Sequence, residues 1–281
     1  MKSTFFGTGV VLAAGAAVPA LAQEAKGLAE PWQLGLQGGV TPNMNELSVF
    51  HDYILLPIIA AISLLVLALL IWVMVRFNEK ANPVPSRTTH NTMIEVIWTI
   101  VPILILAVIA VPSLRLLAHQ RDIPEADMTI KVTGHQWYWS YEYPDEEGLA
   151  FDSVMLEDDE LTEGQHRLLE VDNQVVVPVG KTVRIIATAD DVIHSWAVPA
   201  FGIKIDTIPG RLNEAWFQAT QTGTFYGQCS ELCGIRHAFM PIKVTVMSEA
   251  DYATWLEGAK AEFAAAPARP AGDRRVALAV N

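Results

Sequence analysis

The chain has 281 residues and 51% of them are hydrophobic, which is high for a soluble protein, so part of it is expected to lie in lipid. Its formal net charge of -12 argues against a nucleic-acid partner, because neutralising phosphates needs an excess of Lys and Arg, and makes a basic protein the natural complement. The two cysteines lie in one short segment, which excludes a disulfide-rich scaffold.

Residues 1–22 have the pattern of an export signal peptide. Lys2 supplies a positive charge, residues 5–18 form an apolar stretch, and residues 20–22, Ala-Leu-Ala, form a small-x-small cleavage site before Gln23. The alternative is an uncleaved apolar N-terminus, although the stretch is short for a membrane span. The pattern therefore predicts a mature chain that starts outside the cytoplasm.

The mature N-terminal segment, residues 23–119, contains two long apolar runs. The first covers about residues 54–75 and the second about residues 94–117. Each is long enough to cross the roughly 30 Å hydrocarbon layer of a membrane as a helix. We therefore predict two transmembrane helices joined as a hairpin. Prolines in both runs indicate packing against other helices, because neighbours must satisfy the freed backbone groups.

The connection between the runs favours a cytoplasmic turn, because it carries Arg76, Lys80 and Arg87. Basic residues on the opposite flanks weaken that charge argument. The export signal decides the orientation, since a start outside followed by two crossings returns the chain to the outside. Residues 120–263 are thus predicted to be periplasmic, and the Ala/Pro/Arg-rich residues 264–281 to be a disordered tail.

Glu95 lies in the second apolar run, close to its cytoplasmic end. An ionisable residue inside a span is a functional candidate, because placing a charge there is costly. The alternative is a carboxylate that reaches the membrane interface or is satisfied by a neighbouring helix. The residues alone leave both interpretations open.

From Met128 onward the pattern changes to short runs rich in Val, Ile, Thr and aromatics, separated by Gly, Pro and Asp. This spacing is typical of a small antiparallel sandwich or barrel. The predicted strands are residues 129–143, 174–177, 182–188, 193–198, 215–219, 223–227 and 242–247. A helix is predicted to follow, with Ser248 as its N-cap and Asp251 positioned to reach back.

The first predicted strand contains residues 134–143, Gly-His-Gln-Trp-Tyr-Trp-Ser-Tyr-Glu-Tyr. Alternation along a strand would put Trp137, Trp139, Tyr141 and Tyr143 on one face. Core packing and an interfacial aromatic belt account for most of these rings. An exposed Trp among them would be an outlier that calls for a role.

A cluster of soft ligands precedes the last predicted strand: Cys229, Cys233, His237 and Met240 lie within a dozen residues. Thiolate and thioether together suit copper, and a Cys, two His and a weak Met form the ligand set of electron-transfer copper sites. His194, in an earlier strand, is the best candidate for the second His. The second cysteine suggests a two-copper cluster with bridging sulfurs. A disulfide and a structural zinc site are the alternatives.

Four segments make the chain resemble subunit II of cytochrome c oxidase: residues 134–143, 191–196 (Asp-Val-Ile-His-Ser-Trp), 208–213 (Ile-Pro-Gly-Arg-Leu-Asn) and 227–234 (Gly-Gln-Cys-Ser-Glu-Leu-Cys-Gly). The resemblance extends from the first span to about Leu256. It implies a membrane-anchored all-β protein, in which a hairpin of two N-terminal transmembrane helices precedes a cupredoxin-like Greek-key β-sandwich or barrel. No ligand position departs from the family pattern.

The resemblance implies two copper ions in a binuclear copper A centre. Its six ligand residues would be His194, Cys229, Glu231, Cys233, His237 and Met240. The two thiolates would bridge the metals, each imidazole would bind one copper, the thioether would be a weak ligand, and Glu231 would contribute its backbone carbonyl. The side chain of Glu231 would also reach a magnesium ion at the boundary with subunit I.

The implied function is that of subunit II of an aa3-type cytochrome c oxidase in a bacterial inner membrane. Trp137 matches the aromatic residue that receives electrons from cytochrome c, and Glu95 matches a carboxylate at the start of a proton pathway. Oxygen reduction to water, coupled to proton pumping, would take place on subunit I. Acidic residues between 142 and 163, with Asp190 and Asp191, would steer the basic cytochrome c to the site.

Other functions remain to be compared with this one. Subunit II of a quinol oxidase would share the spans and the sandwich but lack the copper ligands. A copper-binding periplasmic carrier or assembly protein would accept two thiols and a Met, but it would need an exposed and exchangeable site. A periplasmic structural protein with a disulfide is the third alternative, and copper content would exclude it.

Overall fold

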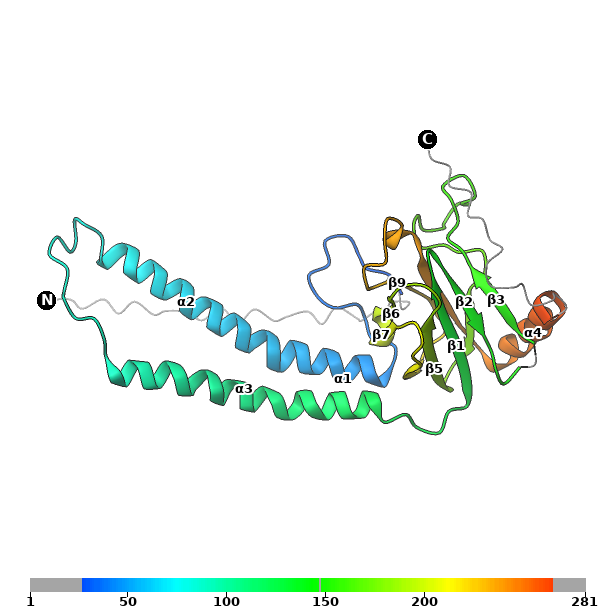
Figure 1. Cartoon of the computed structure of the whole chain (residues 1–281), viewed down its shortest axis with the longest axis horizontal. Coiled ribbons are helices and arrows are strands. Elements are labelled where there is room, and N and C mark those ends of the chain that lie inside the picture. The colour runs from blue at the N-terminus through cyan, green and yellow to red at the C-terminus, as the bar shows by residue number, and fades with distance from the viewer. Residues whose placement is uncertain (1–26, 147, 265–281) are drawn as a thin grey trace, which may run out of the picture.

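The computed structural model describes residues 27–146 and 148–264. The predicted export signal, residues 1–22, lies outside the described residues, as does the predicted tail from residue 265 onward. Two long antiparallel helices extend from one side of a β-sandwich (Figure 1). The prediction of a membrane-anchored all-β protein with two N-terminal helices is confirmed.

The first long helical segment runs from Pro42 to Arg76 and the second, α3, is Thr92–Arg121. The first consists of α1 (Pro42–Phe50), a short π-helical turn η1 (His51–Leu55) and α2 (Leu56–Arg76). In the most apolar stretch of each segment no residue is buried within the chain. Both segments are longer than predicted, because polar turns at the ends continue the apolar cores. The exposed apolar surfaces of both segments indicate that the segments are buried in lipid or against other helices.

In the described part of the chain, ten strands form two five-stranded sheets. The first sheet has the order β3-β2-β1-β5-β8 and the second β4-β10-β9-β6-β7. The bounds are β1 Met128–His135, β2 Tyr138–Glu142, β3 Ala150–Ser153, β4 Val175–Pro178, β5 Thr182–Ala189, β6 His194–Val198, β7 Ile203–Thr207, β8 Asn213–Gln218, β9 Gly223–Cys229 and β10 Pro241–Met247. The pairs β1–β5 and β4–β10 are parallel, and the other pairs are antiparallel.

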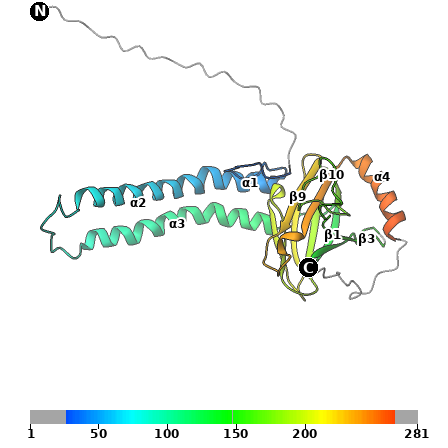
Figure 2. The same ribbon diagram turned by 90° about the horizontal axis from the view of Figure 1, so that it is seen from above.

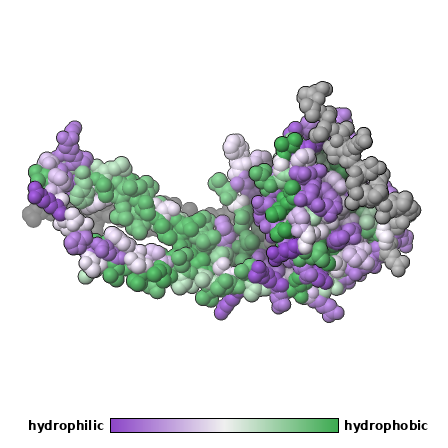
Figure 3. Space-filling model, viewed as in Figure 1, coloured by the Kyte–Doolittle hydropathy of each residue, from purple (hydrophilic) through white to green (hydrophobic). Residues whose placement is uncertain are grey.

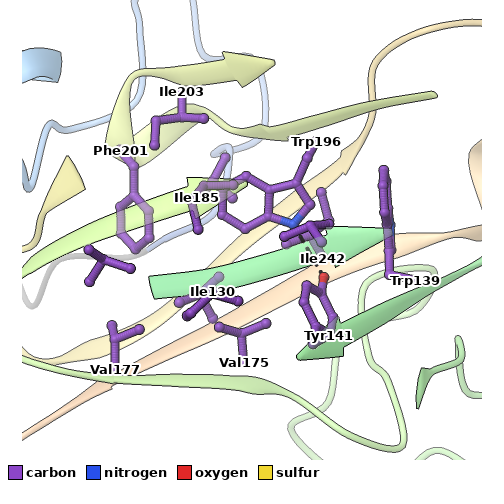
Figure 4. Packing of buried hydrophobic residues seen from close by; sticks show 14 of the residues in the cluster. Ile130, Trp139, Tyr141, Val175, Val177, Ile185, Trp196, Phe201, Ile203 and Ile242 are labelled. Carbon is purple, nitrogen blue, oxygen red and sulfur yellow. Dashed lines mark hydrogen bonds between the residues drawn. The ribbon is translucent and has the colours of Figure 1, made fainter. Parts of the chain in front are cut away.

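The core lies between the two sheets, where alternate residues of each strand meet (Figure 4). Trp139, Tyr141 and Trp196 are at most 1% exposed. Their polar atoms are satisfied inside the core, since Trp196 Nε1 donates to the hydroxyl of Tyr141 at 3.2 Å. Burying such large rings with their hydrogen bonds made gives the sandwich much of its apolar contribution to stability.

The prediction of one strand over residues 129–143 is wrong. β1 ends at His135, the chain turns at Gln136 and Trp137, and β2 returns antiparallel to β1 with Lys131 opposite Glu142. A single strand of that length would span about 50 Å and leave its far half without a neighbour, whereas the hairpin pairs both halves. Trp139, unlike Trp137, is on the buried face of β2.

Two strands were not predicted. β3 has only four residues and an exposed first position, so its sequence carries little periodic signal. β7, Ile-Lys-Ile-Asp-Thr, does alternate between apolar and polar residues and could have been found from that pattern. The predicted helix after the strands is confirmed as α4, Glu249–Ala259, because Ser248 Oγ accepts the N–H of Asp251 at 3.2 Å and donates to its carboxylate at 2.6 Å.

Each helical segment contacts the sandwich at one end. The first does so through residues 40–44. Val40 donates its N–H to the carbonyl of Ala200 at 3.1 Å, and the hydroxyl of Thr41 donates to the carbonyl of Phe201 at 2.8 Å. On α3, the carbonyl of His119 accepts the indole N–H of Trp216 at 3.4 Å. Both helices are therefore held at one end of the sandwich, while α4 lies at the opposite end (Figure 2).

The hydropathy of the surface differs between the helical hairpin and the sandwich. Hydrophobic residues cover the helical hairpin along most of its length, and hydrophilic residues dominate the sandwich and the tip of the hairpin (Figure 3). A membrane around the middle of the hairpin would leave the sandwich in water on one side and the turn near residues 77–91 on the other.

Candidate metal centre

The candidate ligands lie where β6 begins and β9 ends. His194 is the first residue of β6 and Cys229 the last of β9, and these strands are hydrogen-bonded neighbours with Trp196 opposite Cys229. After Cys229 the chain leaves the sheet, passes Cys233, and forms a short 3-10 turn at His237–Phe239 before β10 starts. Antiparallel pairing thus brings two segments 35 residues apart to one place.

The two sulfur atoms lie at the middle of the group. Cys229 Sγ and Cys233 Sγ are 3.8 Å apart, and both cysteines are free. The ligand atoms of His194, Cys229 and Cys233 all lie within 4.8 Å of one another, and all three residues are buried. This geometry could hold a metal ion.

Each sulfur faces one imidazole and one weaker donor. Cys229 Sγ lies 3.9 Å from His194 Nδ1 and 3.4 Å from the backbone oxygen of Glu231. Cys233 Sγ lies 3.5 Å from His237 Nδ1 and 3.6 Å from the sulfur of Met240. These donors are soft, and the combination of thiols with a thioether favours copper among the metals that proteins bind.

Without metal, the two thiols differ in acidity. Burial raises the pKa of the Cys229 thiol, but hydrogen bonds from His194 and the backbone outweigh it and hold that pKa at about 7. Burial and the nearby charge of Cys229 raise the pKa of Cys233 to about 12. Because thiolates rather than thiols bind metals well, metal binding at this site releases protons.

A second layer of hydrogen bonds holds the ligands. Asp191 accepts from His194 Nε2 at 2.9 Å, which turns the other ring nitrogen, Nδ1, toward Cys229. The indole N–H of Trp139 donates to the carbonyl of Met240 at 3.1 Å. The side chain of Gln136 donates to the carbonyl of Cys233 at 2.8 Å, and Trp137 Nε1 donates to the same oxygen at 3.3 Å.

The structure brings together the six residues predicted to bind copper, with Trp137 half-buried beside Cys233. Glu95 lies elsewhere, in the first turn of α3 at the far end of the hairpin. There its carboxylate accepts the backbone N–H of Asn91 at 3.2 Å, as a residue that caps the helix would. The metal and proton roles of these residues stay predictions.

Sequence reasoning missed the supporting residues Gln136 and Trp139. Both come from the β1–β2 hairpin, about a hundred residues before the carbonyls that they bind. No spacing pattern marks such contacts, because the sheets alone bring the hairpin over the cysteine segment. The Asp191-x-x-His194 spacing was a signal, since a carboxylate three residues from a histidine can reach its ring.

The acidic residues predicted to steer a basic partner are partly paired. Glu157 forms an ion pair with Arg236 of the cysteine segment at 2.9 Å, and Asp158 pairs with Arg167 at 3.0 Å. Asp159 and Glu163 are exposed. The loop that carries them is therefore fastened next to the metal-binding segment while part of its charge faces solvent.

Two family models match the chain. The model for the periplasmic domain of cytochrome c oxidase subunit II matches residues 128–247, and the model for its transmembrane domain matches residues 29–116. The probable cytochrome c oxidase subunit 2 of Rickettsia bellii is 55% identical over 226 residues, which cover 80% of this chain and 84% of that protein. Cytochrome c oxidase subunit 2 of Cereibacter sphaeroides is 47% identical over 286 residues, which cover 94% of each.

Among solved structures, the periplasmic domain of subunit II of cytochrome oxidase of Bradyrhizobium japonicum is similar to the sandwich. It has 59% sequence identity and a TM-score of 0.47, and the match covers 50% of this chain and 99% of that one.

Proposed function

This chain belongs to the cytochrome c oxidase subunit II family, and from that membership we propose that it receives electrons at a binuclear copper centre. It is a membrane-anchored subunit of a haem-copper oxidase, an oxidoreductase complex. The donor is cytochrome c, and electrons continue to haem in subunit I of an aa3-type enzyme. Oxygen reduction and proton pumping take place on that subunit.

The six ligand residues would suit two copper ions, because they supply two thiol sulfurs, two imidazoles and two weak donors. A bound copper pair supplies reversible one-electron exchange. The chain's own residues keep both sulfurs away from water, aim one ring nitrogen at each, and fix the ring of His194 through its hydrogen bond to Asp191. A rigid donor set costs little rearrangement when the charge changes.

Two groups at the surface of the metal site face the proposed partners. The carboxylate of Glu231 is exposed on the cysteine segment, where it is free to reach a magnesium ion shared with subunit I. Trp137 touches the backbone of Cys233 and is half-buried, so an electron that arrives at its ring is one hydrogen bond from a ligand residue. Acidic side chains around this edge attract a basic cytochrome c.

The proposed location is a bacterial inner membrane. Residues 1–22 direct export, residues 23–119 supply the two spans, and residues 120–263 form the periplasmic domain, with a tail at 264–281. Glu95 is proposed to begin a proton pathway that continues on subunit I. Its position in the first turn of α3, at the end of the hairpin away from the sandwich, fits that role.

A copper carrier or assembly protein remains the second candidate function. A carrier has to release its metal, so its ligands need access to solvent or to a partner. Here Cys229 is 6% exposed, Cys233 4% and Met240 1%. These buried sulfurs support a permanent electron-transfer site over an exchangeable one. The 3.8 Å separation of the two sulfurs, with one imidazole beside each, is the observation that carries the proposal.

The test uses the oxidase purified with its partner subunits. Wild type is expected to contain the copper of this centre and to show its mixed-valence absorption and electron-spin spectrum. Cys229→Ser should lose both and stop electron uptake from cytochrome c, while the subunit stays assembled. The control is Ser230→Ala, at an exposed neighbouring position, which should keep the spectrum. A wild-type subunit without copper, or with its two thiols joined in the active complex, contradicts the proposal.

A further inference from the structure

The carboxylate of Asp191 connects two parts of the metal centre that are far apart in sequence. One oxygen, Oδ1, accepts from His194 Nε2 at 2.9 Å and from the N–H of Val192 at 2.6 Å. The other, Oδ2, accepts the backbone N–H of Gln136 at 2.6 Å. Asp191 thus contacts the candidate metal ligand His194 on one side and the β1–β2 turn on the other.

The β1–β2 turn is also hydrogen-bonded to Cys233, the second cysteine of the site. Gln136 donates through its side chain to the carbonyl of Cys233, and Trp137 donates to the same oxygen. A chain of hydrogen bonds therefore runs from His194 through Asp191 and Gln136 to Cys233. It closes a ring around the metal site, because His194 and Cys233 both lie against Cys229.

We propose that Asp191 is a positioning residue for the metal centre, which fixes the ring of His194 and holds the Gln136–Trp137 turn against Cys233. The inference rests on the proposed copper function and adds to it a residue that binds no metal. The side chain of His194 is fully buried and that of Asp191 is 33% exposed, so the carboxylate closes the site at its solvent edge.

The charge of Asp191 has a second effect, which acts on the metal through the ring. A carboxylate that accepts from Nε2 makes the imidazole a better electron donor at Nδ1. A better donor favours the oxidised metal. Weakening the hydrogen bond between Asp191 and His194 should therefore raise the reduction potential of the centre, because the oxidised metal is then stabilised less than before.

Asparagine cannot replace this carboxylate. Both oxygens of Asp191 accept hydrogen bonds, whereas an asparagine side chain has one acceptor and one donor group. If its oxygen serves His194, its NH₂ group faces the N–H of Gln136, and two donors then oppose each other. Asp191→Asn must therefore lose one side of the connection while keeping nearly the same volume.

Asp190 provides a matched control. It is adjacent, exposed and acidic, and its carboxylate lies 3.5 Å from Nδ1 of His135, outside the ring of hydrogen bonds. Asp190→Asn removes the same charge from the same edge of the protein. A weaker attraction for a basic donor should therefore affect both variants alike, whereas an altered metal centre should be specific to Asp191→Asn.

The first experiment measures the reduction potential and the near-infrared absorption of the copper centre in the purified oxidase. Asp191→Asn should raise the potential clearly more than Asp190→Asn does, and should shift the absorption, which Asp190→Asn should leave unchanged. Asp191→Asn could instead lose copper while Asp190→Asn keeps it and the unfolding temperature stays unchanged. That result also supports the positioning role, since every ligand residue is still present. Equal potentials and spectra in the two variants overturn it.

A second experiment needs no copper. In the metal-free full-length protein, alkylation of the cysteines by iodoacetamide should be several-fold faster in Asp191→Asn, because the turn over Cys233 is released. Asp190→Asn should react like wild type. Equal rates in both variants overturn the positioning role. If wild type itself carries no copper, the copper proposal fails separately, and this comparison still decides whether Asp191 holds the site.

Discussion

Trp139 and Met240 meet across the sandwich: the buried indole of Trp139 donates a hydrogen bond of 3.1 Å to the backbone oxygen of Met240. Trp139 comes from the first sheet and Met240 from the segment that enters the second. The same indole packs edge-on against His194, with ring centroids 5.9 Å apart. One core residue therefore supports candidate ligands on both sides of the metal site.

Trp139→Phe should weaken both the fold and the metal centre. It leaves a buried carbonyl without its donor, which costs about 1–3 kcal/mol, and it opens a cavity beside His194. Thermal unfolding should occur at a lower temperature, and the copper absorption should shift. Trp216→Phe is the control, since Trp216 also donates to a carbonyl but on α3. If the two variants have the same copper spectrum, Trp139 supports only the core.

Trp137→Phe should slow electron uptake from cytochrome c several-fold and leave the copper spectrum and the unfolding temperature nearly unchanged. The side chain is half-buried against the core at the β1–β2 turn, and Phe keeps an aromatic ring in that contact. Stopped-flow reduction by cytochrome c, compared with reduction by a small-molecule donor, separates docking and transfer from the centre itself. Equal slowing with both donors would mean that Trp137 acts on the centre rather than on electron uptake.

Glu95 allows two roles to be separated by substitution. Glu95→Gln keeps an oxygen for the N–H of Asn91 and should preserve the start of α3, but it cannot release a proton. Turnover and proton uptake of the intact oxidase should fall several-fold, with copper content unchanged. Glu95→Ala should lower turnover and also loosen the helix start. Wild-type turnover in Glu95→Gln would leave helix capping as the role of this carboxylate.

The buried Glu170 forms an ion pair of 2.6 Å with the partly buried Lys243, and the hydroxyl of Tyr226 donates to the same carboxylate at 2.6 Å. Lys243→Met should destabilise the protein by about 3–5 kcal/mol, because it leaves a buried charge unpaired. Glu170→Gln should cost less, and the double variant should recover part of the loss. Thermal unfolding at neutral pH measures all three. A Lys243→Met variant as stable as wild type would show that the pair contributes nothing.

The pH dependence of this pair follows from the pKa of Glu170. Burial raises this pKa, but hydrogen bonds from Lys243 and Tyr226 and the charge of Lys243 outweigh it and hold it below its ordinary value. A lowered folded pKa means that the stabilisation is complete above the unfolded value, about 4.3, and is lost as pH falls through the folded value. The stability difference between wild type and Glu170→Gln should therefore narrow below about pH 4.

Neutralising exposed acidic residues near the cysteine segment should weaken cytochrome c binding. Asp159→Asn with Glu163→Gln should raise KM at low salt and flatten its dependence on ionic strength, because the Debye length shrinks to about 10 Å at 0.1 M salt. The control is Glu249→Gln with Glu257→Gln on α4, at the end of the sandwich away from the hairpin. An equal rise in KM in both pairs would indicate an effect of total charge, not a docking surface.

The sequence by itself determined the features that depend on neighbouring residues. The two apolar runs identified the spans, because crossing a membrane needs about 20 apolar residues in succession. The segment from Cys229 to Met240 holds most of the candidate metal donors, so its chemistry can be predicted from the types and spacing of its residues. The cap at Ser248 was likewise predictable, since capping acts within one helical turn.

Only the tertiary structure decided the contacts between residues that lie on different strands. Residues 129–143 read as one strand, but pairing with neighbours in the sheet favours two, and the resulting turn places Gln136 and Trp137 over Cys233. The distance of His194 from Cys229 follows from the pairing of β6 with β9. Hydrogen bonds between distant strands leave no periodic mark in a sequence, because register is fixed by the packing of the whole sandwich.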